Sequence, residues 1–289
     1  GRLRDGSRGW NAGTVERKQD MKIKKLWNSF KIAFSMYSRI PMPRSEWTDE
    51  NKAYAMCFFP WIGGVIGLLS YGVYRLAGRI EGYQNADAGM NGMGRYGLFF
   101  TIFLVLLPVF ITGGIHLDGF LDTQDALSSW QTKERRLEIL KDSHAGAFAI
   151  ISCSVYFLVY VGVYSALNVE SMQVIAWSFM LSRSLSGLSV VTFPQARKKG
   201  MVADFSEHAS QKITKIVLML YVIVLAVIMV YTGRITGVAC VITAFGVFGY
   251  YHHMAMKNFG GVTGDLCGYF LQVCELLMAF VTVVVSGIL

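Results

Sequence analysis

Three aspartates at regular spacing directly follow an apolar segment, and they are the strongest candidates for chemistry. The stretch 113–130 reads GGIHLDGFLDTQDALSSW and places Asp118, Asp122 and Asp125 at i, i+4 and i+7. At about 100° per residue, these side chains fall within about 60° of one another on a helix. Like charges so close repel unless a cation lies among them. Clustered carboxylates suit Mg²⁺, so we predict that all three are metal ligands; an acidic solvated face is the alternative.

A second group of candidates lies near the C-terminus, in the stretch FGGVTGDLCGYFLQVCELL at 259–277. Gly261 permits close approach of another backbone, and Thr263, Gly264 and Asp265 precede a predicted helix. The free N–H groups at a helix start bind anions. Asp265 is therefore either a further metal ligand or a residue that caps the helix.

A basic loop supplies the third group. The stretch PQARKKGMVADF at 194–205 contains Arg197, Lys198, Lys199 and Gly200. Guanidinium and ammonium groups bind phosphate, but basic loops also fix membrane topology, and both interpretations stay open. Together, acids for a metal with bases and glycines for phosphate indicate phosphoryl chemistry.

The composition indicates a membrane protein, so membrane-spanning helices must position these residues. The chain has 289 residues, of which 53% are hydrophobic and 16% are charged, with a mean hydropathy of +0.42. This excludes a disordered chain, a disulfide scaffold and an ordinary soluble enzyme. Its apolar runs are long enough for helices that cross a hydrocarbon core of about 30 Å. We predict an all-α polytopic bundle with seven spans at about 57–76, 97–115, 147–167, 171–193, 216–232, 236–256 and 266–289.

Arg183 lies within the fourth of these windows and Glu275 within the seventh. An ionisable group within a span is costly and faces the bundle interior, so we expect these two to pair. The five cysteines match no zinc or disulfide spacing and are expected to be small buried side chains. Residues 28–40 are partly amphipathic and predict a short helix on the membrane surface before Pro41.

The basic residues also predict the orientation. Of 27 Lys and Arg residues, 22 fall on the side of the N-terminus and 4 on the other side, with Arg183 inside a span. The positive-inside rule places the N-terminus and all three candidate segments in the cytoplasm and the C-terminus outside. Residues 1–20 lack the apolar core of a signal peptide. We expect them to form a disordered extension before a single membrane domain at 21–289.

Four stretches together make the chain resemble the cobalamin synthase family, whose full name is adenosylcobinamide-GDP ribazoletransferase. They are FSMYSRIPMP at 34–43, HLDGFLDTQDAL at 116–127, KERRLEILKDSHAG at 133–146 and GGVTGDLCGYFLQVCELLMAF at 260–280. The similarity covers about 30–289. This sequence has Lys198-Lys199 where the family usually has Pro-Glu, so a role for the basic loop rests on Arg197 and Gly200. It also has Ala126 where the family often has Gly.

The resemblance implies the last step of nucleotide-loop assembly in the bacterial inner membrane. Adenosylcobinamide-GDP and α-ribazole, or its 5′-phosphate, would give adenosylcobalamin, or its phosphate, and GMP with Mg²⁺ as cofactor. Carried onto this chain, it implies Asp122, Asp265 and Arg197 as catalytic residues, with Asp265 also a metal ligand. It implies that the substrates contact His116, Gly119, Arg197, Gly200, Gly261, Thr263 and Gly264. Association with other enzymes of the pathway is expected, and the oligomeric state stays open.

Other functions are weaker fits. A CDP-alcohol phosphotransferase-like enzyme also has clustered aspartates, but its Asp-Gly is followed by Ala-Arg, whereas Asp118-Gly119 is followed by Phe120. A UbiA-like prenyltransferase has a different Asp spacing. A transporter would place its ionisable groups near the midplane, whereas most acids here lie at one edge. The net charge of +8 comes without interleaved aromatic residues, which argues against nucleic acid.

Overall fold

A computed structural model describes residues 9–80, 96–142, 144–197 and 211–288, with side chains described from residue 23 onward. Most residues in these ranges are helical and none lies in a strand, which confirms the all-α class. The helices are α1 (Gly9–Tyr37), α2 (Asp49–Lys52), α3 (Ala55–Ile80), α4 (Gly97–Thr112), α5 (Ile115–Ser128), α6 (Lys133–Ile139), α7 (Ala147–Ser165), α8 (Val169–Thr192), α10 (Gln211–Phe259) and α11 (Gly264–Ile288).

Five of the described helices, α3, α7, α8, α10 and α11, are long and apolar enough to cross a membrane, and the bent pair α4–α5 makes a sixth candidate. Large apolar side chains on these helices point outward: Leu68, Leu158 and Val227 are 72%, 75% and 63% exposed. Such exposure is unfavourable in water but favourable in lipid. The protein is therefore a polytopic membrane protein, in agreement with the prediction.

Helix α10 joins two windows that the sequence predicts as separate spans. As one straight helix it would measure about 74 Å, more than twice the hydrocarbon core. Its backbone is non-helical at Arg234, with φ 49° and ψ −123°, and Gly237 comes back against the Met229 backbone. The chain therefore reverses near Arg234 into two arms. The count of seven spans stays a prediction, because it requires each arm to cross separately.

Contacts with α8 confirm this reversal. Leu218, before the break, packs on Gly187 near the end of α8. Phe248, after the break, packs on Phe193 at the same end of α8, with ring centroids 5.0 Å apart. Gly233, at the break, lies against Val174 near the start of α8. Both ends of α10 therefore lie at the end of the bundle where α8 finishes.

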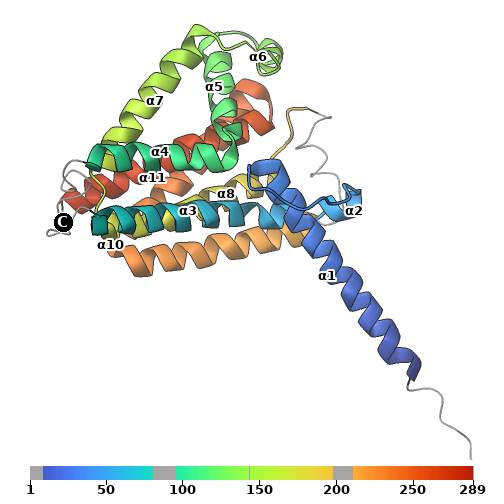
Figure 1. The fold of residues 1–289 in the computed structure, drawn as a ribbon. Helices are drawn as coiled ribbons and strands as arrows, with labels where there is room; N and C mark the ends of the chain where they lie inside the picture. Colours follow the sequence, from blue (N-terminus) through green and yellow to red (C-terminus); the bar gives the residue numbers. More distant parts are fainter. Residues whose placement is uncertain (1–8, 81–95, 143, 198–210, 289) are drawn as a thin grey trace, which may run out of the picture.

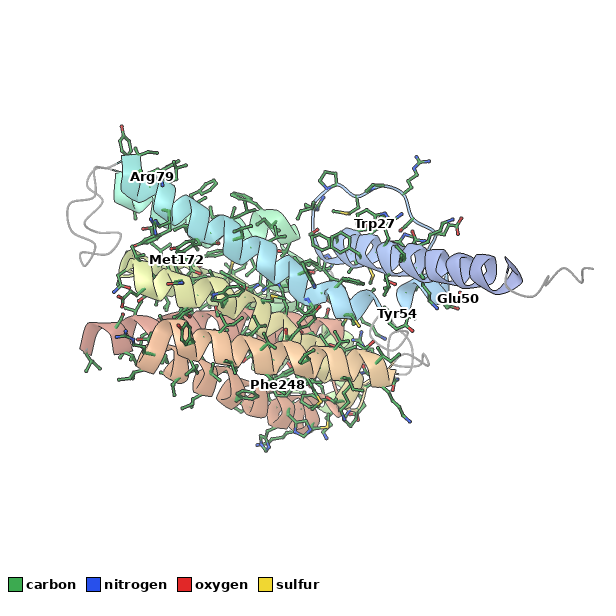
Figure 2. All side chains as sticks on the ribbon, turned by 90° about the horizontal axis from the view of Figure 1, so that it is seen from below. Trp27, Glu50, Tyr54, Arg79, Met172 and Phe248 are labelled. Carbon is green, nitrogen blue, oxygen red and sulfur yellow. The ribbon has the colours of Figure 1, made fainter. Side chains whose placement is uncertain are left out.

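Most long helices run roughly side by side, while α1 projects from one end of the bundle (Figure 1). Arg79 and Met172 lie at one end of the bundle and Tyr54 and Glu50 at the other (Figure 2). The predicted surface helix at 28–40 forms the last part of α1, which ends at Tyr37 and begins at Gly9, within the predicted extension 1–20. The assignment of 1–20 as an extension ahead of one domain stays a prediction.

Deep in the bundle, α8 and α11 are joined by the predicted ion pair. Arg183 Nη1 lies 2.6 Å from Glu275 Oε1, and the two side chains are 1% and 3% exposed. Ser182 also donates to Glu275 Oε1 at 2.8 Å. The described cysteines are all free, as expected. This pair lies one helical turn below Ser186 and Leu271, which line the pocket described next.

Candidate functional site

A sharp bend at two glycines separates the acidic helix α5 from α4. Gly113 and Gly114 have φ of 68° and 81°, in the left-handed region that side chains with a Cβ rarely adopt. The axes of α4 and α5 differ by 95°. After the bend, α5 packs against α11 and α7. The helix that the sequence predicts for the three aspartates is confirmed.

Helices α5 and α11 meet backbone to backbone at a pair of glycines. A Cβ added to Gly119 would lie 2.7 Å from the Asp265 carbonyl oxygen, and one added to Gly268 would lie 2.8 Å from the His116 carbonyl oxygen. Close-packed atoms do not tolerate such approaches, so glycine is required on both helices. Gly119, predicted to bind substrate, is buried in this contact. The contact places the start of α11 beside the first turns of α5.

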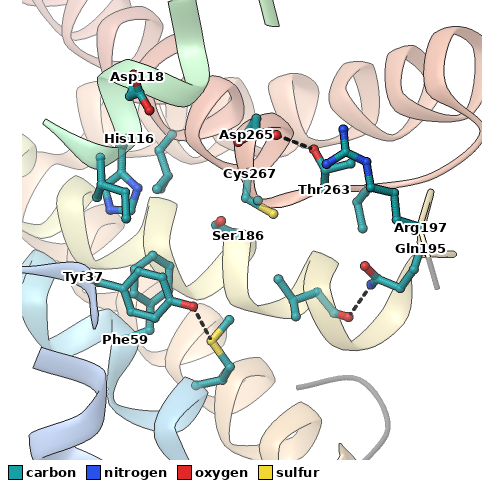
Figure 3. A pocket seen from close by; sticks show the side chains of 16 residues that line it. Tyr37, Phe59, His116, Asp118, Ser186, Gln195, Arg197, Thr263, Asp265 and Cys267 are labelled. Atoms are coloured by element: carbon teal, nitrogen blue, oxygen red, sulfur yellow. Dashed lines mark hydrogen bonds between the residues drawn. The ribbon is translucent and has the colours of Figure 1, made fainter. Parts of the chain in front are cut away.

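A pocket of about 280 Å³ opens beside this contact (Figure 3). Whole-ligand pockets usually measure about 300–1,000 Å³, so this one accommodates part of a large substrate. Its polar lining is formed by Asp118, Ser186, Gln195, Arg197, Thr263, Gly264 and Asp265. Its apolar and aromatic lining is formed by Tyr37, Met56, Phe59, Ile115, His116, Val190, Val262, Cys267 and Leu271.

The basic loop reaches this pocket through a short backbone bridge. Residues Gln195 and Val262 pair in parallel, with Ala196 N–H donating to the Val262 carbonyl at 3.0 Å. Gly261 lies against the backbone of 194–196, where a Cβ would collide. Arg197 then lines the pocket and donates to the Leu137 carbonyl on α6. Gly261 therefore positions Arg197, while Lys198, Lys199 and Gly200 lie outside the described residues.

Thr263 forms the start of α11. Its Oγ1 accepts a hydrogen bond from Leu266 N–H at 3.3 Å, as an N-cap residue does, and donates to Asp265 Oδ2 at 3.5 Å. Thr263 therefore caps the helix, and the Asp265 carboxylate stays directed to the pocket (Figure 3). Because Gly264 also lines the pocket, the positive end of the helix dipole lies at its wall.

The carboxylates on α5 and α11 share one electrostatic environment. Burial, followed by the negative charges of Asp118, Asp265 and Asp125, raises the pKa of Asp122 to about 6. Asp118 and Asp265 line the pocket, whereas Asp122 lies one turn further along α5 and outside its lining. The repulsion predicted from the spacing of the aspartates is therefore present, and it extends to Asp265, more than a hundred residues away in the sequence.

Asp125 is already engaged by the protein. Its Oδ1 accepts a hydrogen bond from Ala149 N–H at 2.9 Å, and its Oδ2 accepts one from Gly146 N–H. Gly146 is the N-cap residue of α7, and a Cβ there would lie 2.7 Å from the Asp125 oxygens. Both oxygens thus satisfy backbone donors at the start of α7, although the sequence predicts Asp125 as a metal ligand.

His116 lies at the aromatic side of the pocket. It is 5% exposed, and its Nε2 has no hydrogen-bond partner among the described residues. Burial, and then the nearby charge of Arg183, lowers the pKa of His116 to about 3. The imidazole is therefore neutral near pH 7, and it offers a substrate an unpaired polar atom rather than a positive charge.

The donor set fits a magnesium ion that a substrate helps to hold. No group of three or more His, Cys, Asp and Glu side chains within the described ranges is arranged to bind a metal ion by itself. Mg²⁺ usually takes one or two protein carboxylates and completes its shell with water and phosphate oxygens. Asp118 and Asp265 line the same pocket as Arg197, so oxygen donors and a phosphate-binding group are both present.

The sequence did not indicate the aromatic wall of this pocket. Tyr37 comes from the end of α1, while Met56 and Phe59 come from the first turns of α3. In an apolar chain, such residues are indistinguishable from core residues. The one available signal was the stretch 34–43, which contains Tyr37 and carries part of the family resemblance.

Comparison with known proteins places the chain among enzymes of one kind. A family model described as cobalamin-5-phosphate synthase matches residues 29–283. The adenosylcobinamide-GDP ribazoletransferase of Lachnoclostridium phytofermentans is 44% identical over 265 residues, which cover 92% of this chain and 97% of that protein.

More distant relatives carry the same name. The protein of Clostridium perfringens strain SM101 is 29% identical, covering 92% of this chain and all of the relative. That of Desulfitobacterium hafniense is 31% identical, covering 88% of this chain and 94% of the relative. No solved structure matches the chain.

Proposed function

Because the chain belongs to the cobalamin-5-phosphate synthase family, we propose that it joins adenosylcobinamide-GDP to α-ribazole or its 5′-phosphate. The products are adenosylcobalamin or its 5′-phosphate, and GMP. The protein is a membrane transferase of cobalamin biosynthesis. The observation that supports this particular reaction is one pocket lined by Asp118, Asp265 and Arg197, which combines carboxylates with a group that binds phosphate.

In this reaction, a ribose hydroxyl that is free in both α-ribazole and its 5′-phosphate attacks the phosphorus that is linked to cobinamide, and any 5′-phosphate stays in place. The bond from that phosphorus to the bridging oxygen breaks, and GMP leaves with that oxygen, while the proton of the attacking hydroxyl is released. Bound Mg²⁺ would neutralise diphosphate oxygens and stabilise the leaving phosphate. Asp118 and Asp265 would hold the ion, with Asp122 adding negative charge from the next turn of α5.

The remaining residues position the reactants. Arg197 would pair with phosphate oxygens of the departing GMP, because a guanidinium offers two parallel donors to such a group. The start of α11 at Thr263-Gly264 presents backbone N–H groups and a positive dipole to the diphosphate. Asp265, at the centre of the pocket, would orient the attacking ribose hydroxyl or accept its proton.

The test is an assay of the full-length protein in lipid nanodiscs with both substrates and Mg²⁺. GMP release that requires α-ribazole, and stops when EDTA removes the metal, is expected. GMP release that continues without α-ribazole would indicate a hydrolase and contradict the proposal. Running the assay with α-ribazole and with its 5′-phosphate identifies the acceptor by the ratio of kcat/KM values.

We further propose that the pocket faces the cytoplasm in the bacterial inner membrane, because 22 of the 27 basic residues fall on that side of the chain. Trp130, at the end of the bundle with α5, is 90% exposed, and Glu170 is exposed at the other end. In Cys153→Ser protein, a membrane-impermeant maleimide should label Trp130→Cys only in inside-out vesicles and Glu170→Cys only in intact cells. The reverse pattern would overturn the orientation.

A further inference from the structure

The two sides of the pocket differ in chemistry. The rings of Tyr37, Phe59 and His116 gather on one side, Arg197 and Thr263 lie on the other, and Asp265 lies between them (Figure 3). The charged side suits a diphosphate. The proposed reaction leaves the aromatic side without a ligand, although it is part of the same pocket.

The aromatic side is a built surface. The rings of Tyr37 and Phe59 lie 4.6 Å apart between centroids. The His116 ring lies 5.8 Å from Phe59 and 6.3 Å from Tyr37, and it is within 20° of parallel to the Tyr37 ring. Met56 closes the wall, with its sulfur 3.9 Å from the Tyr37 hydroxyl. Apolar and aromatic faces of this kind bind flat, weakly polar rings.

A single polar atom on this side lacks a partner. His116 Nε2 is buried without a hydrogen bond among the described residues, and its side chain lines the pocket. A buried polar atom left unpaired is costly, so a ligand atom is the natural partner.

These features discriminate among the parts of the two substrates. The corrin ring is too large for a pocket of about 280 Å³. Guanine presents several donors and acceptors, which an apolar wall with one free polar atom would leave unsatisfied. The base of a ribazole is a benzimidazole, a flat neutral ring with one unsubstituted nitrogen that accepts a hydrogen bond. That base matches the wall in shape, charge and number of polar atoms.

We propose that Tyr37, Phe59 and Met56 hold the benzimidazole of the acceptor nucleoside, and that His116 Nε2–H donates to its free ring nitrogen. The proposal rests on the proposed function, since it names the site of the second substrate. With the base held here, the ribose extends from the aromatic side towards Asp118 and Asp265. The acceptor then meets the diphosphate at the acids, and Arg197 holds the far side of the diphosphate.

The first test needs no protein variant. Binding of α-ribazole to the purified protein is compared with binding of the corresponding indole riboside, in which a C–H replaces the free ring nitrogen. Without the corrinoid substrate, the wild type should bind the indole analogue about tenfold more weakly, as expected for a lost buried hydrogen bond. Equal affinity for the two ribosides would overturn the role of His116.

Variants then locate the effect on the protein. His116→Leu should bind the two ribosides equally. Phe59→Leu should raise the KM for α-ribazole about tenfold, within the range for base–aromatic stacking, and leave the KM for adenosylcobinamide-GDP unchanged. Phe110→Ala, which removes an exposed ring of α4, is the matched control. Thermal unfolding of each variant confirms that it is folded before kinetics are measured.

The outcomes separate this inference from the proposed function. If the wild type releases no GMP, the function fails, and riboside binding still tests the aromatic site. If the wild type is active but Phe59→Leu raises the KM for adenosylcobinamide-GDP instead, the wall holds guanine and the inference is overturned. A selective rise for α-ribazole, together with the analogue result, supports it.

Discussion

Two groups of charged side chains lie within one apolar bundle, and the protein treats them in opposite ways. Arg183 and Glu275 are almost fully buried and meet at 2.6 Å. The carboxylates of Asp118, Asp122 and Asp265 lie at the end of the bundle, where burial and the neighbouring acids raise the pKa of Asp122 to about 6. The first group is paired within the chain, whereas the second gathers three acids near a single arginine among the described residues, Arg197, so a further positive ion is favourable there.

This difference indicates which charged groups in such a protein form a ligand-binding site. A buried ion pair is costly to desolvate and contributes little net stability, but losing one partner is severe. An unpaired acidic group is tolerated at the bundle end, where water reaches it, and its repulsion becomes affinity for a cation. The site is therefore identified by charges that lie at the bundle end and lack an ion-pair partner within the described part of the chain. The presence of charge alone does not identify it.

The largest expected effect comes from the open carboxylates. Asp118→Asn, Asp122→Asn and Asp265→Asn each remove one negative charge at nearly constant volume, so turnover should fall about 10²–10³-fold or more, measured as GMP release in nanodiscs. The variants should remain in the membrane and unfold no earlier than wild type, because repulsion is relieved.

Glu170→Gln is the matched control, since it removes an exposed acid at the opposite end of the bundle; its turnover should equal that of the wild type. Undiminished activity in Asp122→Asn would remove that residue from the site. A loss of folded protein in all three variants would mean that these carboxylates stabilise the fold, as the Arg183–Glu275 pair does, and would contradict the account.

The second effect falls on stability. Arg183→Met leaves Glu275 buried without its partner and should lower the free energy of unfolding by about 3–5 kcal/mol. The double variant Arg183→Met with Glu275→Met should recover most of that loss, because a buried pair is often replaceable by apolar residues. Unfolding of the detergent-solubilised protein measures both, and a double variant no more stable than the single one would contradict the account.

The smallest effect should come from Asp125, which lies on the same helix as the open acids but caps α7. Asp125→Ala removes acceptors for Gly146 and Ala149 N–H and should destabilise by about 1 kcal/mol. Turnover should fall far less than in Asp118→Asn. A loss of turnover as large as in Asp118→Asn would instead restore Asp125 as a metal ligand.

The sequence predicted the local features well because they depend on neighbouring residues. Apolar length located the helices, and helical periodicity put Asp118, Asp122 and Asp125 on one helix. The ion pair between Arg183 and Glu275 was predicted correctly because each charge had few partners within the apolar interior.

Tertiary contacts set the limits of that prediction. The carboxylate of Asp125 turns to the start of α7, which spacing along α5 does not reveal. Gly119 and Gly261 were predicted to touch substrate, whereas close contacts between backbones explain both residues. Phe59 is an apolar residue in an apolar helix, so its place in a pocket wall becomes visible only when α1, α3 and α5 converge.

The most direct test of the central claim is metal binding to the open acids. Mn²⁺, a spectroscopic substitute for Mg²⁺, is titrated into the nanodisc-embedded protein with and without adenosylcobinamide-GDP, and bound metal is followed by electron paramagnetic resonance. The account predicts weak binding alone and much tighter binding with the diphosphate substrate, both reduced in the Asp118→Asn, Asp265→Asn double variant. Equal Mn²⁺ binding by wild type and double variant, or full turnover in EDTA, would contradict it.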